Sequence, residues 1–89
     1  MAKQRESRAR KMNELDGAYR VRAVRRYPTG HESTSFYGPY ASLGAARMVR
    51  SDLRGDYEHR KERVPEQVAF HLHLEVEECQ ANWLVVEAD

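Results

Sequence analysis

Residues 35–55 read SFYGPYASLGAARMVRSDLRG, and this stretch decides the fold because it holds the clearest helix pattern of the chain directly after a strand-like segment. Gly38 and Pro39 interrupt the strand, since proline lacks a backbone donor and glycine adopts backbone angles that other residues avoid. Ser42 is the expected N-cap, because its hydroxyl can accept a hydrogen bond from an otherwise unpaired amide of the first turn. The stretch therefore predicts one helix that starts after Ser42 and ends at Gly55.

The apolar residues of this helix recur at spacings of three and four and define one stripe. The stripe consists of Leu43, Ala46, Val49 or Met48, and Leu53, whereas Arg47, Arg50, Asp52 and Arg54 cover the other side. We expect the stripe to pack against Phe70, Leu72 and either Val85 or Leu84. A small residue such as Ala46 allows the helix to approach the sheet closely.

The residues before the helix predict a β-hairpin. From Tyr19 the sequence alternates, with Val21 and Ala23 on one face and Arg20 and Arg22 on the other. Turn formers follow at positions 28–31, and residues 33–37 return as a second strand. Phe36, in that second strand, is expected in the core.

The residues after the helix predict two more strands. Positions 56–67 alternate in charge and are expected to form a solvated loop or a short helical extension. Apolar residues then alternate strictly with polar ones from Val68 to Glu77, positions 78–82 form a turn, and positions 83–86 close the sheet, with Trp83 in the core. The predicted fold is α+β of the ββαββ type, a single helix on one face of a small, mostly antiparallel sheet. The domain spans residues 18–89, and residues 1–17 form a flexible basic N-terminal tail.

The charge is unevenly distributed although the net charge is only +1. Residues 1–26 hold nine Lys or Arg against three Asp or Glu, whereas residues 64–89 hold six acids and no Lys or Arg. One interpretation is that the two ends pair within one sheet, with Arg20 and Arg22 on the same face as His71, His73, Glu75 and Glu77, opposite the helix. The other is two separate binding patches of opposite sign.

Nothing in the sequence spells a reaction. No nucleophile sits in a recognisable elbow, and no glycine-rich loop precedes a helix to hold phosphate. His71, His73 and Glu75 share one side of a strand, but no CxxC or HExxH motif accompanies them, so we expect neither a metal nor a cofactor. The lone Cys79 and the lack of a long apolar run predict a cytoplasmic protein with no membrane partner.

Two kinds of partner remain open. Tyrosines beside the Gly-Pro turn and arginines on the outer helix face favour a protein partner; these are Tyr37, Tyr40, Arg47 and Arg50. The alternative is a nucleic-acid-binding module that uses the basic tail and first strand, namely Arg8, Arg10, Lys11, Arg20, Arg22, Arg25 and Arg26. A sequence pI near 7.9 is lower than expected for a nucleic-acid-binding domain.

Residues 36–47, FYGPYASLGAAR, together with Trp83, Val85 or Val86, and Glu87, resemble small uncharacterised proteins encoded by phages of actinobacteria. The resemblance implies a non-enzymatic protein that binds a host protein in the host cytoplasm, for host takeover or counter-defence. A weaker similarity, to the arm-binding domain of phage integrases, favours the nucleic-acid alternative. Because small open sheets leave their edges unpaired, we expect a monomer or an edge-strand homodimer.

Overall fold

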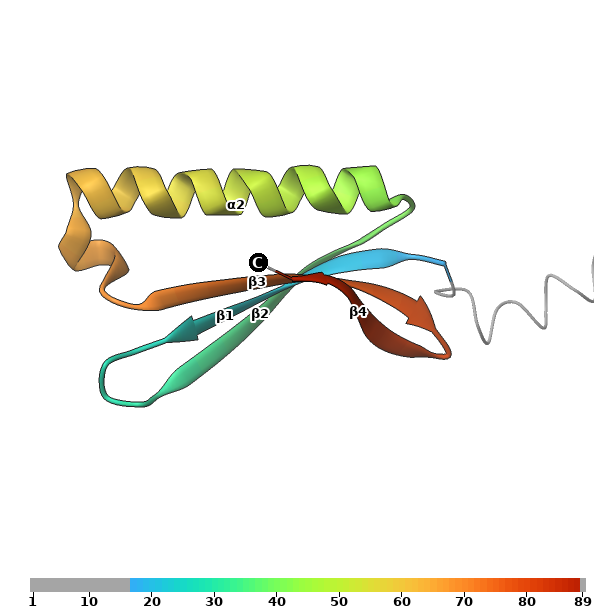
Figure 1. The fold of residues 1–89 in the computed structure, drawn as a ribbon, viewed down its shortest axis with the longest axis horizontal. Coiled ribbons are helices and arrows are strands. Elements are labelled where there is room, and N and C mark those ends of the chain that lie inside the picture. Colours follow the sequence, from blue (N-terminus) through green and yellow to red (C-terminus); the bar gives the residue numbers. More distant parts are fainter. Residues whose placement is uncertain (1–16, 89) are drawn as a thin grey trace, which may run out of the picture.

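The computed structural model describes residues 17–88, which form one antiparallel sheet with a long helix on one side of it (Figure 1). The sheet has four strands in the order β2-β1-β3-β4. The elements are β1 (Tyr19–Arg26), β2 (Glu32–Tyr40), α2 (Leu43–Arg63), the 3-10 turn η1 (Pro65–Val68), β3 (His71–Gln80) and β4 (Asn82–Ala88). The α+β, ββαββ prediction is therefore confirmed. The predicted tail lies, apart from Gly17, outside the described residues.

The core lies between α2 and the two central strands. Val21 stands opposite Val76 and Ala23 opposite Leu74, so the alternating apolar residues of β1 and β3 meet on the face that α2 covers. Side chains of this set are removed from water almost completely, and each valine or leucine among them contributes about 1.5–3 kcal/mol by burial. The buried cluster consists of Val21, Ala23, Ala46, Tyr57, Val68, Leu72, Leu74 and Val76.

The start of the helix agrees with the sequence and its end does not. The amide of Ala45 donates to the Ser42 hydroxyl at 3.2 Å, which is the predicted N-cap. The predicted stop at Gly55 is wrong, because α2 continues for two more turns to Arg63. A glycine inside a helix costs about 1 kcal/mol relative to alanine, whereas burial of Tyr57 stabilises the continuation by more than that.

The Tyr57 side chain fixes the second half of the helix to the sheet. Its hydroxyl donates to the carbonyl of Phe70 at 2.6 Å, and its ring lies 5.6 Å from the Phe70 ring. The helix ends at Arg63, shortly before Pro65, because a proline disfavours the helical conformation of the residue preceding it. Residues 56–63, expected as a loop or a short extension, therefore belong to α2.

Strand ends also differ from the predicted ones. The Gly38-Pro39 pair lies inside β2, which continues to Tyr40 with a shift of register beside Tyr19. The last turn is much tighter than residues 78–82, because Ala81, at φ 65°, is the single residue between β3 and β4. Val68 belongs to η1, so β3 begins at His71 rather than at the first residue of the alternating run.

The helix does not cover the whole sheet. It packs mainly on β1, β2 and β3, and the predicted contacts of Leu53 and Val49 with the core are present. The predicted burial of Leu84 or Val85 under the helix is wrong, since both side chains are exposed. Val85 lies on the sheet face opposite the helix, and Leu84 lies on the edge strand β4, beyond the strands on which α2 mainly packs.

Candidate interaction surface on the open face of the sheet

The face of the sheet opposite α2, which we call the open face, has no second layer over it among the described residues (Figure 1). The polar residues of the central strands project from it and pair across β1 and β3. Arg20 Nε lies 2.7 Å from a carboxylate oxygen of Glu77, and Arg22 Nη1 lies 2.8 Å from one of Glu75. The prediction that the charges of the two chain ends pair within one sheet is therefore confirmed for these arginines.

Two aromatic rings enclose the Arg20 side chain. The guanidinium carbon lies 4.1 Å from the ring centroid of Phe36 on β2 and 4.1 Å from that of Trp83 on β4. This arrangement, the aromatic stack, reaches from one edge of the sheet to the other. Phe36 is 52% exposed and Trp83 half-buried, so the prediction of Phe36 as a core residue is wrong. Its position opposite Arg22 places it on the face that the helix does not cover.

The carboxylates of the open face are shielded from water by the side chains that contact them. Glu77 is 7% exposed, which is unusual for a carboxylate and depends on its hydrogen bond from Arg20. Burial alone would raise the pKa of Glu75, but hydrogen bonds from Arg22 and His73, and their charges, hold that pKa below its usual value. His73 Nε2 lies 3.2 Å from Glu75. Each of these two carboxylates therefore has an arginine partner on β1.

Apolar side chains continue the open face along β4. Val85 stands opposite Glu77 and lies on the open face, whereas Leu84 stands opposite Glu78 and points to the other side. The exposed fractions are 47% for Leu84, 49% for Val85 and 41% for Val86. Because β4 is an edge strand, these side chains lie beside backbone groups that no neighbouring strand covers.

The four residues predicted for protein binding do not form one surface. Arg47 and Arg50 both contact Glu87 near the end of β4, Arg50 at 3.0 Å. The hydrogen bond from Arg47, followed by the charges of both arginines, holds the pKa of Glu87 below its usual value. Tyr37 and Tyr40 lie instead on β2, at the opposite edge, where they are half-buried against the core.

The residues predicted for nucleic-acid binding are also divided. Arg20, Arg22 and Arg26 each pair with a carboxylate, the last with Glu32 at 2.8 Å. Arg25 lies on the helix side of β1, where it donates to the Ser35 hydroxyl at 3.1 Å. Arg8, Arg10 and Lys11 lie outside the described residues.

Within residues 17–88, no three His, Cys, Asp or Glu side chains lie close enough together to hold a metal ion. No helix in this part of the chain is both long and apolar enough to cross a membrane.

Comparisons with known proteins identify no relative: the chain matches no family model, no curated protein and no solved structure. The candidate surface therefore depends on its geometry alone. Sequence reasoning missed Phe36 and Trp83 because it assigned large aromatic rings to the core. The alternation of side chains along β2 offered a signal. Phe36 and Tyr37 are neighbours and so point to opposite faces of the sheet, and Phe36 shares the face of the charged residues of β1.

Proposed function

We propose that this protein is a non-enzymatic binding module that contacts a protein partner through its open face. The observation that carries the proposal is the aromatic stack, in which Phe36 and Trp83 hold Arg20 in one geometry at the centre of an exposed surface. Tryptophan, aromatic residues and arginine dominate the binding energy of protein interfaces. A side chain that is already fixed loses little conformational entropy when a partner binds.

The chemistry of the surface favours an apolar contact on the partner. The arginines and carboxylates of β1 and β3 already neutralise one another, so they offer little net charge to a ligand. Phe36 within the stack is exposed, and exposed Val85 extends the contact area beyond it. A partner that covers them removes apolar surface from water at about 25 cal/mol per Å².

The proposed partner is a host protein, in keeping with the resemblance of residues 36–47 to small phage proteins. Nucleic acid is the less favoured partner, because three of the four arginines on β1 are engaged by carboxylates. A second copy of this chain, joined through β4, is the other outcome that the test must distinguish.

The test compares two exposed apolar residues on opposite sides of the molecule. Phe36→Ser removes an outer ring of the stack, and Met48→Ser changes a side chain of α2 that is 67% exposed. Tagged wild-type protein and both variants are used to capture partners from nuclease-treated host lysate. We expect one stoichiometric protein with the wild type and with Met48→Ser, and its loss with Phe36→Ser.

Three results would contradict the proposal. Equal capture by both variants would place the contact elsewhere. Capture that disappears with nuclease treatment, and weakens steeply with salt, would indicate nucleic acid instead. Analytical ultracentrifugation that shows only a dimer of the chain, abolished by Val85→Ser, would assign the apolar surface to self-association. Melting curves of all variants show whether each is folded.

A further inference from the structure

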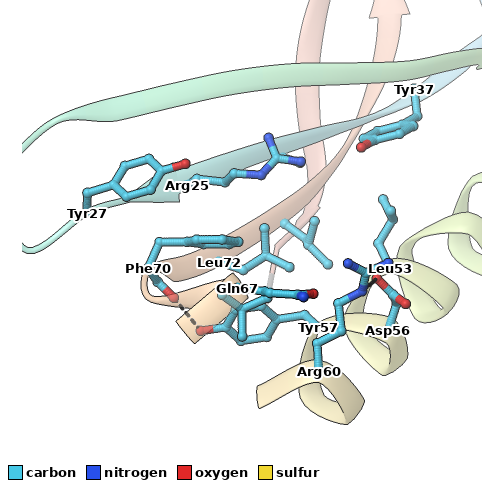
Figure 2. Close-up of a pocket in the computed structure, with 13 residues that line it drawn as sticks. Arg25, Tyr27, Tyr37, Leu53, Asp56, Tyr57, Arg60, Gln67, Phe70 and Leu72 are labelled. Atoms are coloured by element: carbon cyan, nitrogen blue, oxygen red, sulfur yellow. Dashed lines mark hydrogen bonds and ion pairs between the residues drawn. The ribbon is translucent and has the colours of Figure 1, made fainter. Parts of the chain in front are cut away.

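A second concave site lies on the other side of the sheet, between the C-terminal half of α2 and the ends of β1 and β3 (Figure 2). It has a volume of about 460 Å³, within the range of small-molecule sites. Its apolar floor includes Leu53, Leu72 and Leu74, and its walls are aromatic and polar. The open face is on the opposite side of the sheet, so this pocket is independent of the proposed protein contact.

Aromatic rings line one wall of the pocket. The Phe70 ring lies 5.4 Å from the Tyr27 ring and 5.6 Å from the Tyr57 ring. These separations are those of interacting aromatic pairs, and the three rings form a continuous row from β1 to α2. A planar ligand can therefore contact ring surface along one side.

Hydrogen-bond donors lie above this wall. Figure 2 shows the Arg25 guanidinium extending toward the Tyr37 hydroxyl, whereas the Tyr27 hydroxyl is directed at the other end of the Arg25 side chain. Arg25 uses one of its five N–H groups on the Ser35 hydroxyl. Within residues 17–88, neither tyrosine hydroxyl has a hydrogen-bond partner and Arg25 has no carboxylate partner, unlike the other three arginines of β1. The site therefore presents donors and one uncompensated positive charge.

The charged side chains that line the pocket indicate how many negative charges its ligand carries. A guanidinium binds a carboxylate through two parallel hydrogen bonds, and one such group balances a single negative charge. The second cation of the pocket, Arg60, lies 3.0 Å from Asp56 and is neutralised by it. Asp56 also lines the pocket, so this ion pair adds no net charge to it, and Arg25 is left to balance one negative charge on a ligand.

We propose that this pocket binds a small aromatic monocarboxylate, with Arg25 holding the carboxylate, Tyr37 donating to it, and Phe70 contacting the ring. Arg25 is a binding residue in this assignment, which separates it from the paired arginines on the open face. The Ser35 hydroxyl holds the guanidinium over the pocket, as the 3.1 Å contact shows.

The test uses 4-hydroxybenzoate as the probe and 4-hydroxybenzamide as its neutral analogue. Each is titrated into ¹⁵N-labelled full-length protein and followed by amide chemical shifts. We expect saturable shifts around Arg25, Tyr57 and Phe70 with the acid and at least about tenfold weaker binding of the amide, because the charge-assisted hydrogen bonds are lost.

Two neighbouring arginines supply the matched control. Arg25→Gln should weaken binding of the acid about tenfold or more, whereas Arg26→Gln, which removes the same charge from the opposite face, should leave it within about twofold. Arg25→Lys keeps the charge but loses the paired donors, and it should weaken binding as well.

The proposal is wrong if the wild type shows no saturable shifts, or if the acid and the amide bind equally. It is equally wrong if the two glutamine variants lose affinity to the same extent, since a general charge effect would then explain the binding. The comparison of acid and amide uses only the wild type, so it decides the matter even where a variant does not fold.

Discussion

Removing Arg20 should destabilise the protein far more than its position on a sheet surface suggests. Glu77 is 7% exposed, and in the Arg20→Ala variant it loses its cationic partner at 2.7 Å. Breaking a fully buried ion pair by removing one partner costs about 3–5 kcal/mol. Because the Arg20 side chain is 24% exposed, we reduce this figure to about 1–2 kcal/mol. The two ring contacts add about 0.5 kcal/mol each at a partly exposed site.

The expected total, about 2–3 kcal/mol, is a large part of the roughly 5 kcal/mol that a domain of this size has. The control is Arg26→Ala, which removes an arginine from the same strand and the same face. Arg26 and Glu32 are both about half exposed, so this change should cost less than about 0.5 kcal/mol. Urea denaturation followed by far-UV circular dichroism measures both free energies of unfolding.

A double-mutant cycle separates the ion pair from the ring contacts. Glu77→Gln removes the buried charge, so Arg20→Ala should cost about 1 kcal/mol less in that background than in the wild type. Trp83, the only tryptophan, should shift its folded-state fluorescence to longer wavelength in Arg20→Ala because its ring loses cover. If Arg20→Ala and Arg26→Ala have equal free energies of unfolding, the aromatic stack contributes nothing beyond an ordinary surface pair and our reasoning is refuted.

Three further predictions concern the helix and the carboxylates. Gly55→Ala should raise the free energy of unfolding by about 0.5–1 kcal/mol in urea denaturation, because Gly55 lies inside α2 and an added Cβ meets no atom within 4 Å; a loss of stability would contradict this. Leu53→Ala should lower the melting temperature and cost about 2 kcal/mol, the low end for a leucine, because Leu53 is half-buried; an unchanged transition would mean that the helix face is wrongly assigned. The pKa values of Glu75 and Glu87 are lower in the folded chain than in the unfolded one. Below about pH 5 the unfolded chain therefore binds more protons than the folded chain. The stabilisation from these two groups is present above their unfolded pKa and is lost as the pH falls through their folded pKa. Urea midpoints measured down to about pH 3 should fall, less so in Glu75→Gln, and a pH-independent midpoint would exclude this linkage.

The local patterns of the sequence predicted the faces of the elements. The alternation of Arg20 and Arg22 with Val21 and Ala23 assigns β1 correctly, because a strand must send successive side chains to opposite faces. The Ser42 cap could also be predicted from the sequence, because it depends only on residues within one helical turn. Such features need no knowledge of what lies across the sheet.

Features that depend on distant contacts were not predictable in this way. The passage of α2 through Gly55 depends on Tyr57 reaching the Phe70 carbonyl, thirteen residues further along the chain. The alternation in β2 indicates the face on which Phe36 lies, but its exposure depends on the lack of a second layer over that face among residues 17–88. The alternation of β1 already places Arg25 on the opposite face from the other three arginines. A count of positive charges does not show this difference, because it treats all four arginines of β1 alike.

The arginines of β1 suggest a binding surface, but the ion pairs of the open face give them a structural role as well, which is to fix the register of β1 against β3. The observed register sets Arg20 opposite Glu77 and Arg22 opposite Glu75. A slip of one residue would turn the apolar side chains away from the helix. A slip of two residues keeps the faces but breaks both pairs and leaves only one arginine opposite a glutamate, because it sets either Arg22 opposite His73 or Arg20 opposite Cys79. The charges therefore discriminate against the slips that hydrophobic alternation alone permits. The arginines that fix this register already pair with carboxylates of β3. A partner would therefore contact the rings around Arg20 rather than its charge.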